Sequence, residues 1–130
     1  MATILVIEDN PDNMTLAVLL LTSAGHTVLS ATDAEIGLIL AHAQLPQLIL
    51  MDIQLPGMDG LQATALLKGD VATAAIPVIA LTALAMKGDE ARIRAAGCDG
   101  YIAKPMSVQR FLTAVAAQLA SPPPAPSVAA

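Results

Sequence analysis

The chain has 130 residues, of which 55% are hydrophobic and only 13% are charged, and its formal net charge is −5. This length fits one domain, and the hydrophobic content is sufficient to bury a continuous core. A membrane span is not expected, because the longest strictly apolar run near helix length, residues 16–21, is far short of the roughly 20 residues required. Direct nucleic-acid binding is not expected either, since the chain has only six lysine and arginine residues and only two aromatic residues.

The N-terminus and the single cysteine bear on the cellular compartment. The sequence Met-Ala-Thr runs directly into an apolar segment, without a basic leader or a small-residue cleavage site, so a cytoplasmic protein is expected. Cys98 has no second cysteine to pair with, and no group of cysteine and histidine residues has zinc-ligand spacing. We interpret Cys98 as a small packed side chain.

Five short apolar runs predict the strands of a parallel sheet. They are residues 4–7, 27–31, 48–51, 78–81 and 100–103. Four of them are nearly continuous in apolar residues, as is typical of strands that helices cover on both faces. The last run is assigned as a strand more from its position than from its pattern.

Helix start and stop signals lie between these runs. Asn10 can cap a first helix that ends at Gly25. Thr32 and Glu35 have capping-box spacing for a second helix that reaches about His42. Three further helices are expected over residues 60–69, over residues 86–96, and after a cap at Ser107. Five strand–helix repeats predict a doubly wound α/β fold with right-handed crossovers.

The C-terminal segment differs from the rest in composition. Residues 121–130 read SPPPAPSVAA, and four prolines in ten residues cannot extend a helix. We expect residues 1–120 to form the domain and residues 121–130 to be a disordered tail or a linker.

Polar side chains follow four of the predicted strands. Glu8 and Asp9 come after the first strand, Asp52 after the third, Thr82 after the fourth and Lys104 after the fifth. In open α/β sheets, ligands bind beyond the carboxyl ends of the strands, where the strand order reverses. These groups, although distant in sequence, are therefore expected along one edge of the sheet.

Three neighbouring carboxylates repel one another, and a hard divalent cation relieves that repulsion. Mg²⁺ suits such a site, because it binds one or two carboxylates and keeps positions for water and phosphate oxygens. Asp52 can act as a nucleophile and form an acyl phosphate. The Lys104 ammonium would neutralise charge on the phosphoryl oxygens, and Thr82 could donate its hydroxyl to one of them.

Together these residues resemble the receiver domain of two-component response regulators, the CheY-like family, over about residues 3–119. The motifs that carry the resemblance are Glu8-Asp9-Asn10, residues 51–60 (MDIQLPGMDG), Leu81-Thr82-Ala83 and residues 101–105 (YIAKP). The resemblance implies a flavodoxin-like sheet of strand order 2-1-3-4-5 with five helices. Within the family, residues 83–90 and 97–98 resemble DivK-type single-domain regulators and the receivers of hybrid kinases.

The resemblance also implies the roles of the site residues. A histidine kinase or a histidine phosphotransfer protein would donate the phosphoryl group to Asp52. Mg²⁺ would be bound by Asp9, Asp52 and the backbone carbonyl of Gln54, with Glu8 assisting.

The resemblance further implies a conformational switch. Thr82 and Tyr101 match the family's switch pair, and a downstream protein would read the changed surface. Such a domain catalyses only its own phosphorylation and dephosphorylation, so it is not expected to be an enzyme in the usual sense.

Other protein classes fit the residues less well. A dehalogenase-like phosphatase needs a second aspartate two residues after the nucleophile, where this chain has Gln54. A flavodoxin-like flavin module needs Ser, Thr and Gly in its first loop, where Glu8 and Asp9 would repel a phosphate. The remaining alternative is a receiver-like interaction module that acts without phosphorylation.

Overall fold

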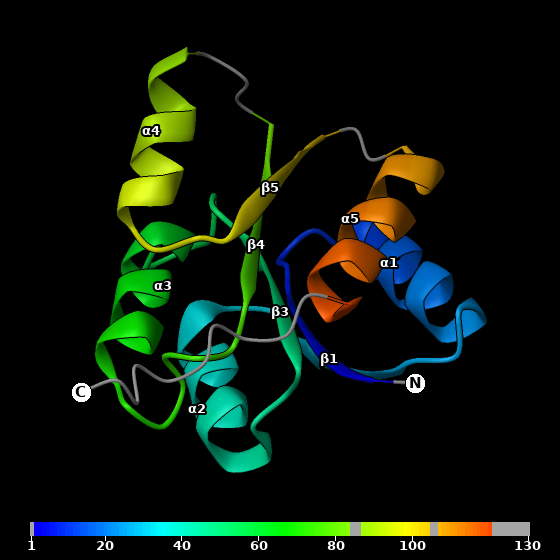
Figure 1. Cartoon of the computed structure of the whole chain (residues 1–130), viewed down its shortest axis with the longest axis horizontal. Helices are drawn as coiled ribbons and strands as arrows, with labels where there is room; N and C mark the ends of the chain where they lie inside the picture. Colours follow the sequence, from blue (N-terminus) through cyan, green and yellow to red (C-terminus); the bar gives the residue numbers. More distant parts are fainter. Residues whose placement is uncertain (1, 84–86, 105–106, 121–130) are drawn as a thin grey trace.

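The computed structural model describes residues 2–83, 87–104 and 107–120, in which five strands and five helices alternate (Figure 1). The strands are β1 Thr3–Ile7, β2 Thr27–Ala31, β3 Leu48–Asp52, β4 Val78–Thr82 and β5 Gly100–Ala103. The helices are α1 Pro11–Ser23, α2 Ala34–Gln44, α3 Gly60–Gly69, α4 Lys87–Ala95 and α5 Val108–Ala120. The predicted tail, residues 121–130, lies outside the described residues.

All the strands pair in parallel in one sheet of order β2-β1-β3-β4-β5. The order reverses between β1 and β3, which are therefore the two strands flanking the switch point. The predicted fold class and strand order are confirmed. β3 and β4 are buried along their whole length, whereas the edge strands β2 and β5 are partly exposed.

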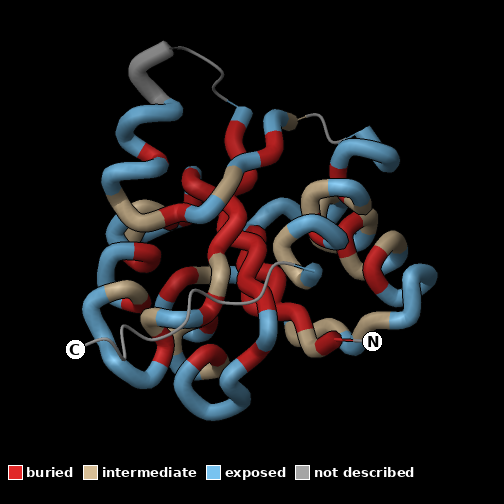
Figure 2. The backbone as a smooth tube through the Cα atoms, viewed as in Figure 1, coloured by how far each residue is buried: buried red, intermediate tan, exposed pale blue. Residues whose placement is uncertain are grey.

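Helices cover both faces of the sheet, with α1 and α5 on one face and α2, α3 and α4 on the other (Figure 1). Strand residues alternate between two buried clusters: Leu50 packs with Phe111 of α5, and Met51 packs with Leu67 of α3. The buried positions therefore concentrate along the sheet and the inner sides of the helices (Figure 2). Burying each large apolar side chain contributes about 1.5–3 kcal/mol to folding.

The predicted boundaries of α1 are confirmed. The side-chain oxygen of Asn10 accepts hydrogen bonds from the backbone N–H groups of Asp12 and Asn13, which caps the helix. Gly25 follows the end of the helix with a φ of 93°, a conformation that side chains with a Cβ rarely adopt.

The predicted cap of α2 is wrong by one residue. Asp33, and not Thr32, is the N-cap, and its carboxylate accepts a hydrogen bond of 2.8 Å from the backbone N–H of Ile36. The backbone of Asp33 is extended, so the helix begins at the next residue, Ala34, although both adjacent residues are of a type that can cap.

The capping box lies instead at the start of α3, where Asp59 and Gln62 exchange side-chain-to-backbone hydrogen bonds. The predicted cap of α5 is present, since the Ser107 hydroxyl accepts from the backbone N–H of Arg110 at 3.5 Å. α4 ends at Ala95, and the first residue of its predicted range, Met86, lies outside the described residues.

Within the described residues, none of the helices combines the length and the apolar character needed to cross a membrane.

Candidate functional site

The strand register brings Glu8 and Asp52 together. Ile7 and Met51 are paired residues of β1 and β3, and Glu8 and Asp52 come next on these neighbouring strands. Because strand side chains alternate between faces, the two carboxylates project to the same side of the sheet. Both are buried, with exposed fractions of 0% for Glu8 and 3% for Asp52.

Lys104 reaches both of these carboxylates from the residue after β5. Its Nζ lies 2.8 Å from Oε1 of Glu8 and 3.2 Å from Oδ2 of Asp52. The side chain of Lys104 is only 16% exposed, so these ion pairs are weakly screened by water.

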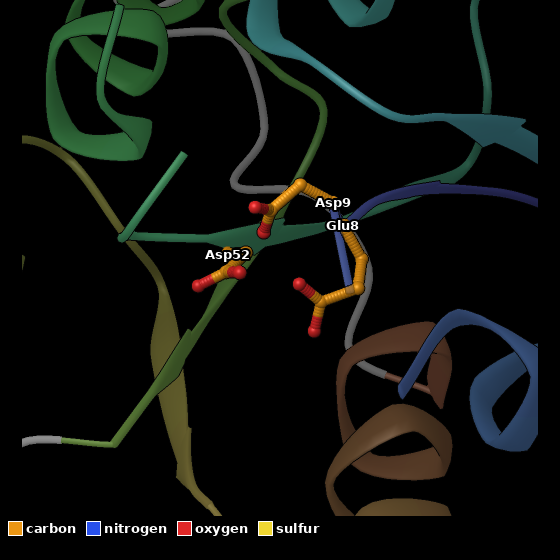
Figure 3. A group of neighbouring side chains, drawn as sticks. All are labelled: Glu8, Asp9 and Asp52. Atoms are coloured by element: carbon orange, nitrogen blue, oxygen red, sulfur yellow. The ribbon is translucent and has the colours of Figure 1, made fainter. Parts of the chain in front are cut away.

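Asp9 completes an acidic cluster at the same edge. One carboxylate oxygen from each of Glu8, Asp9 and Asp52 lies within 4.8 Å of the others. Figure 3 shows the three side chains side by side at the ends of the strands. Asp9 is exposed, so the cluster is buried on one side and open to solvent on the other. The predicted convergence of these acids with Lys104 is thus present in the structure.

Thr82 is the last residue of β4 and is 2% exposed. Its carbonyl accepts a hydrogen bond of 2.7 Å from the backbone N–H of Lys104. Tyr101, on β5, is 39% exposed. Alternation along both strands places Thr82 and Tyr101 on the face of the sheet that α2, α3 and α4 cover.

The loop after β3 holds Asp52 through the backbone. The N–H of Gln54 donates to Oδ1 of Asp52 at 3.0 Å, while the Gln54 side chain is exposed. This hydrogen bond was not part of the sequence-based expectations, although an aspartate that bonds two residues onward is a known signal of an Asx turn.

Gly60 fixes the distance between α3 and the phosphoacceptor candidate. A Cβ added at Gly60 would collide with the backbone carbonyl oxygen of Asp52, and it would lie 2.9 Å from the Cα of Ile53. The Gly60 N–H also donates to the Ile53 carbonyl at 2.9 Å. Only glycine permits this close approach, which places the first turn of α3 against the end of β3.

The ionisation of the two buried acids is coupled. Burial and the neighbouring Glu8 carboxyl raise the pKa of Asp52 to about 7, against the opposing effects of the Gln54 N–H and Lys104. Burial also acts to raise the pKa of Glu8, but its hydrogen bonds to Asp52 and Lys104 outweigh burial and hold that pKa below its ordinary value. Burial acts to lower the pKa of Lys104, but Glu8 and Asp52 raise it, so the ammonium stays charged.

The donor set fits a hard divalent cation. Three carboxylates carry up to three negative charges, and Lys104 is the one cation that the described residues place in ion pairs with them. Burial, together with the neighbouring Glu8 carboxylate, is what raises the pKa of Asp52, and a bound cation would favour its ionised form. Oxygen ligands from Asp9 and Asp52, open to water on one side, match the preference of Mg²⁺ for a few carboxylates and several waters.

The comparison with protein families agrees with this site. Residues 4–116 match the model of the response regulator receiver domain. The chain belongs to this family and is a receiver domain of two-component signal transduction.

Two relatives indicate which kind of response regulator this chain resembles. The chain is 46% identical, over 117 residues, to the polar-differentiation response regulator DivK of Brucella anthropi, covering 90% of this chain and 95% of that protein. DivK of Brucella ovis matches equally well. The chain is therefore DivK-like.

Solved structures give the same fold. A response regulator from Chloroflexus aurantiacus superposes with a TM-score of 0.89 at 28% identity, covering 92% of this chain and 98% of that one. The receiver domain of the sensor histidine kinase PA1611 from Pseudomonas aeruginosa superposes with a TM-score of 0.86 at 34% identity and the same coverage. That structure has a magnesium ion coordinated in its active-site cleft.

Proposed function

We propose that Asp52 accepts a phosphoryl group from a phosphohistidine of a histidine kinase or a histidine phosphotransfer protein. The observation that carries this proposal is the buried Asp52 carboxylate, 3.2 Å from Lys104 and within 4.8 Å of two further acids. A buried acid in such a setting is a candidate nucleophile, because a nearby cation favours its ionised form, and the ionised carboxylate is the form that attacks phosphorus.

The transfer is a direct displacement at phosphorus. An oxygen of the ionised Asp52 carboxylate forms the new P–O bond, and the P–N bond of the phosphohistidine breaks. The imidazole nitrogen takes the bonding electron pair, and a proton carried by the other ring nitrogen lets the ring leave as neutral imidazole. The product is an acyl phosphate on Asp52, and its later hydrolysis returns the carboxylate and inorganic phosphate.

Asp9, Asp52 and the backbone carbonyl of Gln54 would hold Mg²⁺, with Glu8 assisting. When bound, the ion supplies positive charge that neutralises phosphoryl oxygens and keeps Asp52 ionised. Glu8 also holds Lys104 in place through its 2.8 Å ion pair.

Lys104 and Thr82 act on the phosphoryl group from the neighbouring strands. The Lys104 ammonium, already 3.2 Å from Asp52, would bind a phosphoryl oxygen, and the Thr82 hydroxyl would donate to another. Thr82 would move toward the phosphoryl group to make this hydrogen bond. This movement would open space on its face of the sheet, and Tyr101 would turn inward from its exposed position. A downstream protein would read the altered surface.

The remaining features complete the proposal. Residues 1–120 constitute the receiver domain and residues 121–130 a tail or linker. The protein acts in the cytoplasm, and its catalysis is limited to its own phosphorylation and dephosphorylation.

The test uses a small phosphodonor and intact mass spectrometry. Incubation with acetyl phosphate and Mg²⁺ should give a single phosphoryl adduct, and chelation of the metal should abolish it. Asp52→Asn should give no adduct, whereas Glu35→Gln, at an exposed acid outside the site, should react like the wild type. Lys104→Ala should slow adduct formation by about 10²-fold, the usual effect of removing one stabilising donor.

Absence of an adduct, with Mg²⁺ binding verified by NMR, would overturn the proposal. It would instead favour a receiver-like interaction module that acts without phosphorylation.

A further inference from the structure

We propose that the outer surface of α2 and α3 is a docking site for a basic amphipathic helix of a partner protein. This surface, called here the α2–α3 surface, consists of Ile36 and Ile39 on α2, Leu66 on α3, and Met58 just before α3. It is separate from the phosphorylation site at the strand ends, and the proposal does not depend on phosphorylation.

Each helix has an inner side that is fully used in packing. Ala34, Gly37 and Ala41 of α2 are buried, and a Cβ at Gly37 would collide with Ile7. α2 therefore lies directly on the sheet and turns its two isoleucines outward. Ile36 is 45% exposed and Ile39 is 67% exposed.

α3 is arranged in the same way. Ala63, Thr64 and Leu67 are buried, whereas Leu66 is 53% exposed. The outer side of α3 also contains a shallow hollow of about 450 Å³, which is lined by Met58, Gln62, Ala65 and Leu66. This hollow can accept one apolar side chain of a partner.

The outer sides of α2 and α3 adjoin each other. α2 and α3 contact each other, and Nε2 of His42 lies 2.8 Å from Oδ2 of Asp70 at their C-terminal ends. Ile39 lies about one turn before His42, and Leu66 lies about one turn before Asp70. Because both helices follow parallel strands and run in the same direction, Ile39 and Leu66 lie at a similar level along the helix pair.

Acidic groups lie at one end of this apolar centre. Asp33, Glu35 and Asp59 lie at the N-terminal ends of the two helices, whereas Asp70 at the other end pairs with His42. The first 67 residues of the chain contain no lysine or arginine.

The nearest cations are already paired within the chain. Lys68 donates to the carbonyls of Ala74 and Ile76 and to the Asp99 carboxylate, and His42 pairs with Asp70. The rim of the α2–α3 surface is therefore acidic at the N-terminal ends of the two helices.

The exposed apolar residues and the nearby acidic groups favour a basic amphipathic helix as the partner. Large exposed apolar residues gathered on one surface are typical of an interaction site. An amphipathic helix places apolar residues at i, i+3 and i+4 against such a surface, and flanking Lys and Arg residues would meet the acidic rim. A second copy of this chain is disfavoured, because it would bring the same acids face to face.

The experiment uses a fluorescein-labelled peptide of leucine and lysine with helical amphipathic spacing. Fluorescence anisotropy with the full chain should show saturable binding that weakens with salt. A peptide with glutamate in place of lysine should bind at least about tenfold more weakly, a difference of about 1.4 kcal/mol.

Variants then locate the site. Ile39→Ser and Leu66→Ser should each weaken binding by about tenfold. Leu19→Ser is the matched control, because Leu19 is a 60% exposed leucine on α1, and it should leave binding unchanged. Glu35→Gln should reduce the salt dependence, and an unchanged far-UV circular dichroism spectrum shows that each variant is folded.

Methyl NMR of the isoleucines gives an independent readout, with peptide-induced shifts expected at Ile36 and Ile39. The proposal is overturned if Leu19→Ser weakens binding as much as Leu66→Ser, or if the glutamate peptide binds equally well. Self-association in sedimentation experiments that Ile39→Ser abolishes would also overturn it, in favour of a second copy.

Discussion

At the scale of single residues, the burial of Asp52 opposes its ionisation unless a cation is bound nearby. Asp52 must be ionised to attack phosphorus, yet burial and the adjacent Glu8 carboxyl raise its pKa to about 7. Lys104 offsets part of this effect and remains charged because both acids face it. The state of Asp52 therefore depends on what else occupies the acidic cluster.

A pH dependence of Mg²⁺ binding follows from this conflict. Below pH 7 the Asp52 carboxyl is mostly protonated, so a bound cation must displace the proton. The apparent affinity for Mg²⁺ should rise with pH, most steeply around pH 7, with proton release on binding. Isothermal titration calorimetry in two buffers of different ionisation heat measures both quantities. An affinity independent of pH across this range would show that Asp52 is ionised before the metal binds.

The close approach at Gly60 gives a second prediction. Gly60→Ala should lower the free energy of unfolding by about 1–3 kcal/mol, because the new methyl group would collide with the Asp52 carbonyl. It should also slow phosphorylation by moving Asp52. Gly69→Ala is the matched control, since nothing lies near a Cβ at that helical position, and it should be neutral or slightly stabilising. Urea denaturation measures the stability, and equal effects of the two variants would contradict the steric explanation.

Much of the candidate site could be predicted from the sequence. Parallel strands bring their carboxyl ends to one edge, so the acids, the threonine and the lysine at four strand ends had to lie near one another. The pairing of Lys104 with Glu8 at 2.8 Å and the raised pKa of Asp52 could not be predicted, because both depend on distances and burial. The hydrogen bond from the Gln54 N–H to the Asp52 carboxylate depends on the course of the loop after β3.

At the scale of elements, the hydrophobic pattern predicted the strands and helices but did not predict every helix end correctly. α2 illustrates the reason, since Thr32 and Asp33 are both good capping residues and stand side by side. In the structure the backbone of Asp33 is extended and its carboxylate accepts the hydrogen bond from the Ile36 N–H, so Asp33 is the cap. The local sequence pattern does not choose between two adjacent residues that can both supply the cap oxygen.

The link between α2 and α3 gives an element-scale prediction. Nδ1 of His42 lies 2.8 Å from the Leu38 carbonyl, and its Nε2 lies 2.8 Å from the Asp70 carboxylate. Both partners are acceptors, so both contacts are hydrogen bonds only in the protonated imidazolium. The Leu38 carbonyl, together with Asp70, raises the pKa of His42 above its ordinary value of 6.5.

The raised pKa of His42 sets the direction in which the stability changes with pH. The stabilisation by His42 is fully present below about pH 6.5 and is lost as the pH rises through the higher folded-state pKa. Thermal melts of wild type and His42→Gln should therefore differ most at acidic pH and converge at alkaline pH. His26→Gln serves as a control for the second histidine. A difference that grows with pH would contradict the proposed ion pair.

At the scale of the whole molecule, the sheet connects the site to a distant surface. Thr82 and Tyr101 lie on adjacent strands and on the same face, so a displacement of one changes the space available to the other. Tyr101 is the only tyrosine and the chain has no tryptophan, so its fluorescence reports on one position.

Phosphorylation should reduce acrylamide quenching of Tyr101, because the ring moves from a 39% exposed position toward the interior. Thr82→Ala should still accept the phosphoryl group but show little change in quenching. Equal quenching before and after phosphorylation of the wild type would place the switch elsewhere.

Chemical trapping tests most directly whether Asp52 is the phosphoacceptor. Borohydride reduces an acyl phosphate to an alcohol, so the phosphorylated aspartate becomes homoserine, which peptide mass spectrometry locates. After treatment with acetyl phosphate and Mg²⁺, homoserine should appear at position 52 and nowhere else, and only when Mg²⁺ is present. Conversion at Asp9, or none at all after a phosphoryl adduct has formed, would contradict the account.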